Sequence, residues 1–258
     1  MLIMENELIN NQLINPEDEI NSIIFDALEA ILDSTMEDGM LKEMPIIGIA
    51  TKILNAGKLV RDRIFYNKVV KFFKNIGHYS DKEKADFFER HNKDESARQR
   101  LGEQIVIYLD KFDNLEKPVL LAKAYGAYIQ GKISFPEFLD LGNLISIIKT
   151  HYLSEIAVIL VFATDLDYKS LPIGDTFKRF LPFCEQEWLL ERNDEINEDN
   201  YGHRMITDKA ILIPIVKYKS TKLARNFSSY IINDIYEVER QRINEHYKNV
   251  YINPNNLR

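Results

Sequence analysis

Apolar side chains recur at intervals of three or four residues through much of residues 16–163, and this helical spacing constrains the fold more than any other feature. The clearest stripes are Ile20, Ile23, Ile24, Ala27, Leu28, Ile31 and Leu32; Ile46, Ile49, Ile53, Ala56, Val60, Ile64, Val69 and Phe73; and Leu101, Ile105, Leu109 and Phe112. Ten glycines in 258 residues are few for a turn-rich β fold. The sequence therefore predicts a mostly α-helical protein.

Local signals mark the ends of several helices. Ser80 followed by Glu83, and Ser134 followed by Glu137, have the spacing of capping boxes, in which the hydroxyl and the carboxylate each bind an orphan backbone N–H group. Asp113 with Glu116 repeats this spacing and predicts another helix start. Gly131 then predicts the end of that helix, because glycine accepts the left-handed conformation that often closes a helix.

The second half mixes helices with short strands. The apolar run Ile156–Ala163 has only eight residues, whereas a membrane span needs about 20, so it predicts a core helix. Arg204–Ile206 and Ile211–Tyr218 carry strand signals, and Pro214 excludes a central strand. The final segment, Phe227–Tyr247, returns to helical spacing.

A helix, a polar loop and a strand follow one another after residue 176. The helix is expected to hold Phe177, Phe180, Leu181, Trp188, Leu189 and Leu190. The polar loop Asn193–Asn200 and the segment Tyr201–Asp208 come next, in an order that resembles the end of a winged-helix domain. Ala210, where a glycine is common, and Pro214 depart from that pattern.

These elements predict a helical array followed by a winged-helix-like (α+β) module and a C-terminal helix. We expect a loose N-terminal arm at 1–15, a helical domain at 16–142, the winged-helix-like module at 143–218 and a helical tail at 219–258. The boundary is placed near Gly142-Asn143, where no linker composition marks it.

Charge is distributed unevenly, although the formal net charge is only -7. Residues 1–43 hold eleven acids and one base, residues 44–77 hold seven bases and one acid, and residues 185–199 hold seven acids and one base. One interpretation is that each block is the solvated face of an amphipathic helix. The alternative is that the acidic N-terminal segment covers the basic segment until a partner displaces it.

The basic segment begins with the apolar stretch Met44–Ala50 and predicts a long helix from Pro45 to Phe73, with Gly77 as its stop. Such a helix either packs at the centre of the helical half or lies on an anionic membrane surface. We expect partner binding through this helix or the acidic loop, by the residues Lys52, Lys58, Arg61, Arg63, Lys68, Lys71, Lys74, Asp194, Glu195, Glu198 and Asp199.

The sequence contains no residue pattern typical of a catalytic or metal-binding site. The five histidines are scattered, and the single cysteine, Cys184, lies between Phe183 and Glu185, a context that raises a thiol pKa and weakens it as a nucleophile. The turn ending at Glu137 lacks the carboxylates of a calcium loop. We therefore expect no catalytic residue, no cofactor and no metal. The acidic loop also disfavours DNA binding, because it would repel phosphates.

A resemblance covers residues 44–217. Pro45, Ile46, Ile47 and Gly48, then Arg61, Asp62 and Arg63, with Met205-Ile206-Thr207 downstream, resemble a group of bacterial proteins with a helical front half and a winged-helix-like end. The layout also looks like the abortive-infection alpha type of phage-defence proteins. This resemblance implies a cytoplasmic bacterial protein in phage defence and supplies no catalytic residues.

The leading hypothesis is a non-enzymatic cytoplasmic interaction or effector protein, with a protein partner or a second copy of itself as its ligand. The first alternative is a peripheral membrane protein that uses the basic helix 45–74. The second is a winged-helix DNA-binding regulator.

Overall fold

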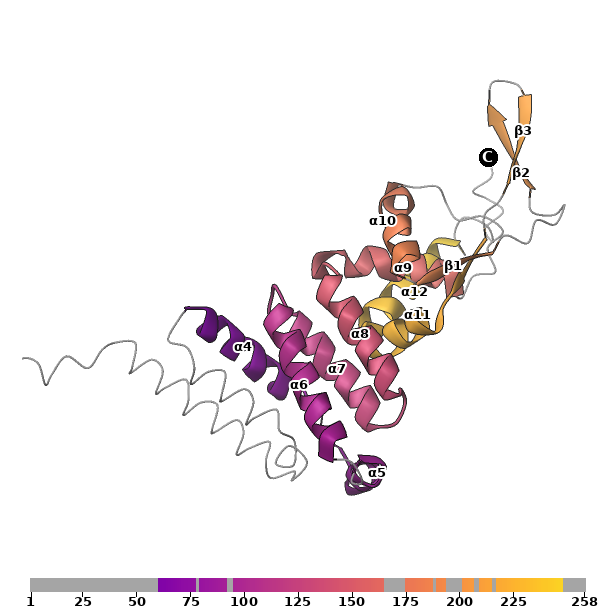
Figure 1. The fold of residues 1–258 in the computed structure, drawn as a ribbon. Helices are drawn as coiled ribbons and strands as arrows, with labels where there is room; N and C mark the ends of the chain where they lie inside the picture. Colours follow the sequence, from indigo (N-terminus) through magenta and orange to yellow (C-terminus); the bar gives the residue numbers. More distant parts are fainter. Residues whose placement is uncertain are drawn as a thin grey trace, which may run out of the picture. The chain divides into compact units, whose positions relative to one another are not determined.

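The structure, a computed structural model, describes eight stretches of the chain. They are residues 60–77, 79–91, 95–164, 175–187, 189–193, 201–206, 209–214 and 217–247. Contacts divide the chain into two compact units, Met1–Asp110 and Lys111–Arg258. The described residues are mostly helical (Figure 1), which confirms the mostly α-helical character predicted from the sequence. The arm at 1–15, the stripe from Ile20 to Leu32 and the front of the basic helix lie outside the described residues.

Three helices carry the described core of the first unit: α4 (Val60–Lys74), α5 (Asp81–His91) and α6 (Glu95–Lys111). The side chains that fill this core are Phe65, Tyr66, Val69, Phe72, Phe73, Phe87, Leu101, Ile105 and Leu109. Leu101, Ile105 and Leu109 of the predicted stripe lie on α6 and are buried, and Phe112, which follows the end of this helix, is buried as well. The helix α4 ends at Lys74, three residues before the expected stop at Gly77.

The start of α5 confirms the first predicted capping box. The backbone N–H and the hydroxyl of Ser80 both donate to Glu83 Oε2, over 2.8 and 2.7 Å. The backbone N–H of Glu83 donates in return to Ser80 Oγ over 3.3 Å. Two orphan donors at the helix start are thus satisfied by side chains.

The second unit begins with α7 (Lys117–Ile129) and α8 (Phe135–Ile147), which pack against each other. Gly131 closes α7 with a φ of 69°, while the N–H of Gly131 donates to Tyr128 O and that of Lys132 donates to Ala127 O. These two bonds are the Schellman pattern that glycine permits. The second capping box is also confirmed, because the N–H and hydroxyl of Ser134 each lie 2.7 Å from Glu137 Oε2.

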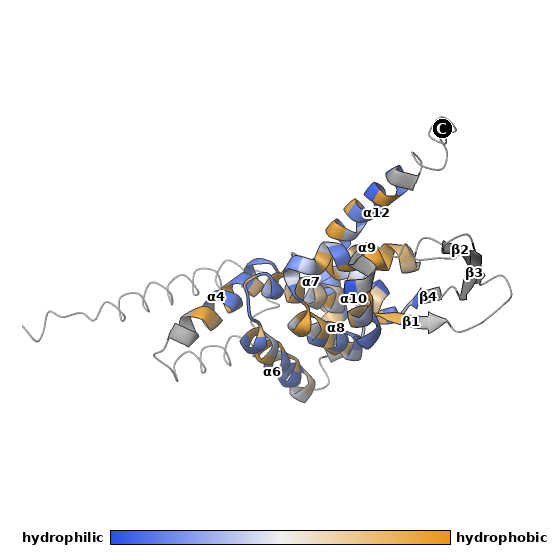
Figure 2. Cartoon of the chain, turned by 90° about the horizontal axis from the view of Figure 1, so that it is seen from above, coloured by the Kyte–Doolittle hydropathy of each residue, from blue (hydrophilic) through white to orange (hydrophobic). Residues whose placement is uncertain are grey.

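The chain then passes through the 3₁₀ turn η1 (Thr150–Tyr152) into α9 (Leu153–Thr164), which is the most apolar helix of this unit (Figure 2). Its side chains at 156, 157 and 159–161 are all at most 1% exposed, which confirms the predicted core helix. Within the described residues, no single helix is long and apolar enough to cross a membrane. The helix α8 and the segment Thr150–Ala163 pass that test only as a pair bent by 97°.

The helix α10 (Asp175–Gln186) packs on α9 and leads into two antiparallel strand pairs. The strand β1 (Leu190–Asn193) pairs with β4 (Lys217–Ser220), and β2 (Tyr201–Ile206) pairs with β3 (Lys209–Pro214). The prediction that Leu190 lies in the helix is therefore wrong. It opens β1 opposite Ser220, a partner 30 residues away that local spacing does not reveal.

The C-terminal segment is helical, as predicted, but is not continuous. The helix α11 (Lys222–Asn226) runs into the π-helical turn η3 (Phe227–Ile231), and α12 (Asn233–Tyr247) follows and packs on α9. Ile232, with φ −117° and ψ 25°, interrupts the helix. The expected boundary at Gly142-Asn143 falls inside α8, whereas the contacts divide the chain after Asp110.

Two ion pairs fasten the C-terminal helices to the front of this unit. Lys123 Nζ of α7 lies 2.9 Å from Asp234 Oδ2 at the start of α12. Lys222 Nζ of α11 lies 2.7 Å from Glu137 Oε1 of α8, an oxygen that also accepts from Asn226 Nδ2 over 3.1 Å. The contact with Lys222, the hydrogen bonds from Ser134 and the bond from Asn226 together lower the pKa of Glu137 to about 2, well below its ordinary value of 4.5.

Candidate functional site

The exposed face of α4 carries part of the predicted basic surface. Ile64, Asn67, Lys71 and Lys74 follow one another at helical spacing, and all four are exposed. The opposite face of the helix is buried through Phe65, Val69 and Phe72, so the exposed four form one continuous stripe. We call these four residues the α4 stripe.

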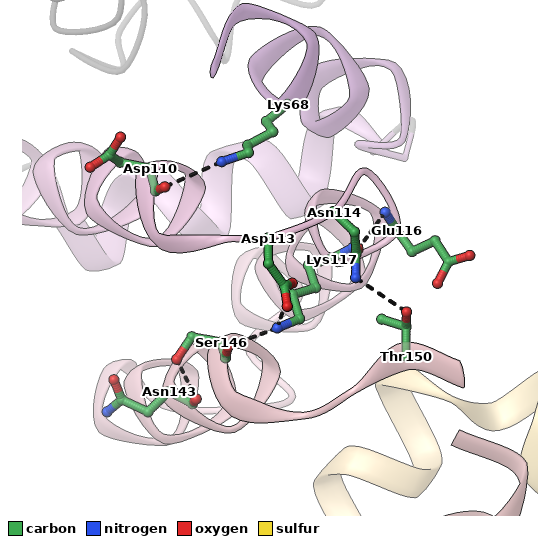
Figure 3. A network of polar contacts seen from close by, with 9 residues as sticks. All are labelled: Lys68, Asp110, Asp113, Asn114, Glu116, Lys117, Asn143, Ser146 and Thr150. Carbon is green, nitrogen blue, oxygen red and sulfur yellow. Dashed lines mark hydrogen bonds and ion pairs between the residues drawn. The ribbon is translucent and has the colours of Figure 1, made fainter. Parts of the chain in front are cut away.

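Lys68 does not belong to this stripe, and its prediction as a partner-binding residue is corrected. Its side chain is buried, with 6% of the residue exposed, and Nζ donates to the backbone oxygen of Asp110 over 3.2 Å (Figure 3). Asp110 lies in the last turn of α6, where carbonyl groups lack helical partners and attract a cation. Lys68 therefore stabilises the end of a helix instead of facing solvent.

The other predicted partner residues lie outside what the structure describes. Arg61 and Arg63 fall in the first turn of α4, where only the backbone is described. The rest are Lys52, Lys58, Asp194, Glu195, Glu198 and Asp199. The α4 stripe, with Lys71 and Lys74, is thus the part of the predicted surface that the structure shows.

A buried lysine organises the turn between α6 and α7, which is drawn in Figure 3. Lys117 is 1% exposed, and its Nζ donates to Ser146 O over 2.7 Å and lies 2.9 Å from Asp113 Oδ1. The acceptor Ser146 O lies at the end of α8, so Lys117 caps α8 as Lys68 caps α6. Each of these two lysines binds a backbone oxygen near the end of a helix, so neither is available to a ligand.

The start of α7 differs from the prediction. Asp113 and Glu116 do not form a capping box; Asn114 Oδ1 instead accepts the N–H groups of Glu116 and Lys117, over 2.9 and 3.1 Å. Asp113 is occupied by its ion pair with Lys117. The Asn114 amide also donates to Thr150 Oγ1 over 3.3 Å, which ties the turn to η1 (Figure 3).

One cation and three aromatic rings form a cluster that joins η1 to α10. Arg179 Nη2 of α10 donates to the Tyr152 hydroxyl over 2.7 Å, and Arg179 Cζ lies 5.0 Å from the centroid of the Tyr152 ring. The rings of Phe180 and His151 lie 4.7 and 4.0 Å from that of Tyr152. We call Arg179, Tyr152, Phe180 and His151 the Arg179 cluster.

This cluster was not predicted from the sequence. Arg179 and Tyr152 are 27 residues apart and lie in different elements, so no local spacing joins them. The signal available in the sequence was compositional: a basic and aromatic residue follow one another at Arg179-Phe180, and again at His151-Tyr152. That signal is too common to select a site by itself.

Cys184 behaves as its sequence context predicts. Its side chain is fully buried, and this burial, with a smaller contribution from Glu185, raises the pKa of the thiol to about 12. The thiol is therefore protonated and unreactive at neutral pH. Across the described stretches, no three His, Cys, Asp or Glu side chains gather in a group that would hold a metal ion. Comparisons with protein-family models, curated proteins and solved structures find no match to this chain.

Proposed function

We propose that this chain acts by binding a protein partner, and that the α4 stripe is part of the contact surface. The observation that supports this most directly is the state of Lys71 and Lys74. Both are exposed, and neither makes an ion pair or a side-chain hydrogen bond with the residues that the structure describes. Two cations on one helix face, unpaired among the residues that the structure describes, favour an acidic partner surface.

Ile64 supplies the apolar part of the proposed contact. Its side chain is 52% exposed at one end of the stripe, and the two lysines occupy the other end. Protein interfaces combine an apolar centre with a polar, charged rim, and the α4 stripe has both kinds of residue along about three turns of helix. The partner that fits has an apolar pocket bordered by carboxylates.

Three elements of the proposal rest on the sequence. The acidic loop with Asp194, Glu195, Glu198 and Asp199 is a second proposed contact for the partner. The proposed winged-helix-like arrangement of 143–218 is based on the sequence, and the succession of α10 and the two strand pairs is consistent with it. We propose further, on the resemblance to abortive-infection proteins alone, that the binding serves phage defence in the bacterial cytoplasm.

Affinity capture of the tagged full chain from native lysate, with and without nuclease, tests this proposal. The decisive comparison is between Lys71→Glu/Lys74→Glu and the control Lys82→Glu/Lys219→Glu, which reverses two exposed charges elsewhere. We expect one stoichiometric protein to persist after nuclease with the wild type and the control, and to be absent with the α4 variant. Equal recovery with both variants would exclude the α4 stripe as the contact.

A peripheral membrane role is the second candidate, because an exposed apolar residue beside two lysines also suits an anionic lipid surface. Co-sedimentation of the same variants with phosphatidylserine-containing vesicles separates the two candidates. Vesicle binding that disappears in Lys71→Glu/Lys74→Glu, together with no captured protein, would favour the membrane. A DNA-binding role would instead appear as captured nucleic acid that nuclease removes.

A further inference from the structure

The Arg179 cluster contains a cation that its neighbours hold in place and that makes no ion pair with the side chains that the structure describes. The Arg179 side chain donates a hydrogen bond to the Tyr152 hydroxyl, and its Cζ lies 5.0 Å from the centroid of the Tyr152 ring and 5.3 Å from that of Phe180. The side chain is nevertheless exposed. Neither Glu155 of α9 nor Glu185 of α10 pairs with it.

A guanidinium group carries five N–H donors, and the Tyr152 hydroxyl uses one of them. The remaining donors have no acceptor among the described residues. The two rings and the hydroxyl already restrict the side chain, so an incoming ligand pays little of the entropy that ordering a free arginine costs. Arg179 is therefore preorganised to bind an oxyanion through paired hydrogen bonds.

Two further basic side chains lie in the turn that carries Tyr152. The backbone N–H of Tyr152 donates to Lys149 O over 2.9 Å, which closes η1 and sets Lys149 and His151 on either side of Thr150. Both side chains are exposed, and among the described residues Lys149 makes no ion pair. Asn114 Nδ2 donates to Thr150 Oγ1 in this turn, and Lys117 Nζ donates to Ser146 O at the end of α8, so the turn and the helix before it are both tied to the start of α7.

We propose that the Arg179 cluster, with Lys149, binds the phosphate group of a small phosphate ester. Phosphate fits this surface better than a carboxylate, because it carries nearly two negative charges at neutral pH and three oxygens that accept hydrogen bonds. Arg179 supplies the paired donors, His151 supplies a ring N–H in either protonation state, and Lys149 supplies an ammonium group. This site lies wholly in the second unit and does not depend on the α4 stripe.

Titration of the full chain with inorganic phosphate tests the proposal, with sodium chloride adjusted to hold ionic strength constant. The readouts are the ring signals of His151 and Tyr152 in NMR spectra and the melting temperature. We expect saturable shifts of both rings and a higher melting temperature with phosphate. Arg179→Gln is expected to weaken phosphate binding about tenfold or more, as the loss of a charge-assisted contact does.

The control Arg240→Gln removes an equal charge from an exposed position of α12 and is expected to bind phosphate like the wild type. If Arg179→Gln does not fold, Arg179→Lys keeps the charge but loses the paired donors, and a severalfold weaker affinity is expected. Three results would overturn the proposal: ring signals that ignore phosphate, an affinity unchanged in the Arg179 variants, or acetate that binds as tightly as phosphate. If Arg179→Gln lowers the melting temperature and phosphate changes neither protein, Arg179 only stabilises the fold and the proposed phosphate site is wrong.

Discussion

Replacing Glu137 by glutamine removes the charge that joins α8 to α11, and the structure sets both the size and the pH range of the effect. The pKa of Glu137 falls from 4.5 to about 2 chiefly through the contact with Lys222, then through the bonds from Ser134. Taken at full value, this difference corresponds to at most about 3.4 kcal/mol of stability at neutral pH. Because the Lys222 side chain is 74% exposed, solvent screens the pair, and we expect about 1–2 kcal/mol.

The sign of the pH dependence follows from the lowered pKa. The folded state holds the ionised carboxylate more tightly than the unfolded state does, so the stabilisation is complete above about pH 4.5 and disappears as the pH falls through about 2. Urea unfolding followed by circular dichroism, from pH 7 downward, measures it for the wild type and Glu137→Gln. The exposed residue Glu245 provides the control variant Glu245→Gln. Equal losses in both variants, or a difference that persists unchanged to about pH 2, would refute this reasoning.

Three further substitutions or probes test other parts of the fold. Lys117→Met leaves Ser146 O at the end of α8 without its donor, and we expect a loss of about 1–3 kcal/mol in urea unfolding; no loss would show that the buried ammonium is not a net stabiliser. Gly131→Ala places a side chain at a φ of 69° and is expected to cost about 1–2 kcal/mol, with Gly131→Asn costing less; equal stability of all three proteins would contradict the Schellman turn. Cys184, with its buried thiol and a pKa of about 12, is expected to react with a thiol reagent only as fast as the chain unfolds, and prompt labelling of the native protein would contradict its burial.

Features set by neighbouring residues were predictable from the sequence. The capping boxes at Ser80 and Ser134 and the turn at Gly131 each depend on residues within one helical turn, and all three are confirmed. Asn114 shows the limit of such signals. Asp113 has the expected spacing from Glu116, but its carboxylate pairs with Lys117, and the neighbouring amide takes over the cap.

Lys68 was misassigned although its spacing carries the information. It lies three residues after Phe65 and four before Phe72, so it belongs to the buried face of α4, whereas charge alone had grouped it with Lys71 and Lys74. A buried lysine needs a partner, and the carbonyl of Asp110 provides one from another helix. The helical spacing therefore locates the buried face, but only the fold locates the acceptor.

Contacts between residues far apart in the sequence could not be predicted from the local spacing of residue types. Short apolar runs such as Leu189-Leu190 fit a helix or a strand equally well, and the pairing of Leu190 with Ser220 decides between them. The Arg179 cluster depends in the same way on the packing of α10 against η1 and α9. When a surface combines residues from two separate segments, those residues do not recur at a regular spacing in the sequence, so no sequence pattern predicts the surface.

The most direct test of the proposed binding role is the affinity of the captured partner for the wild type, Lys71→Glu/Lys74→Glu and Lys82→Glu/Lys219→Glu, each measured at low and high salt. We expect tight, salt-sensitive binding by the wild type and the control, and at least tenfold weaker binding by the α4 variant at low salt. An affinity that is the same for all three proteins, and independent of salt, would contradict it.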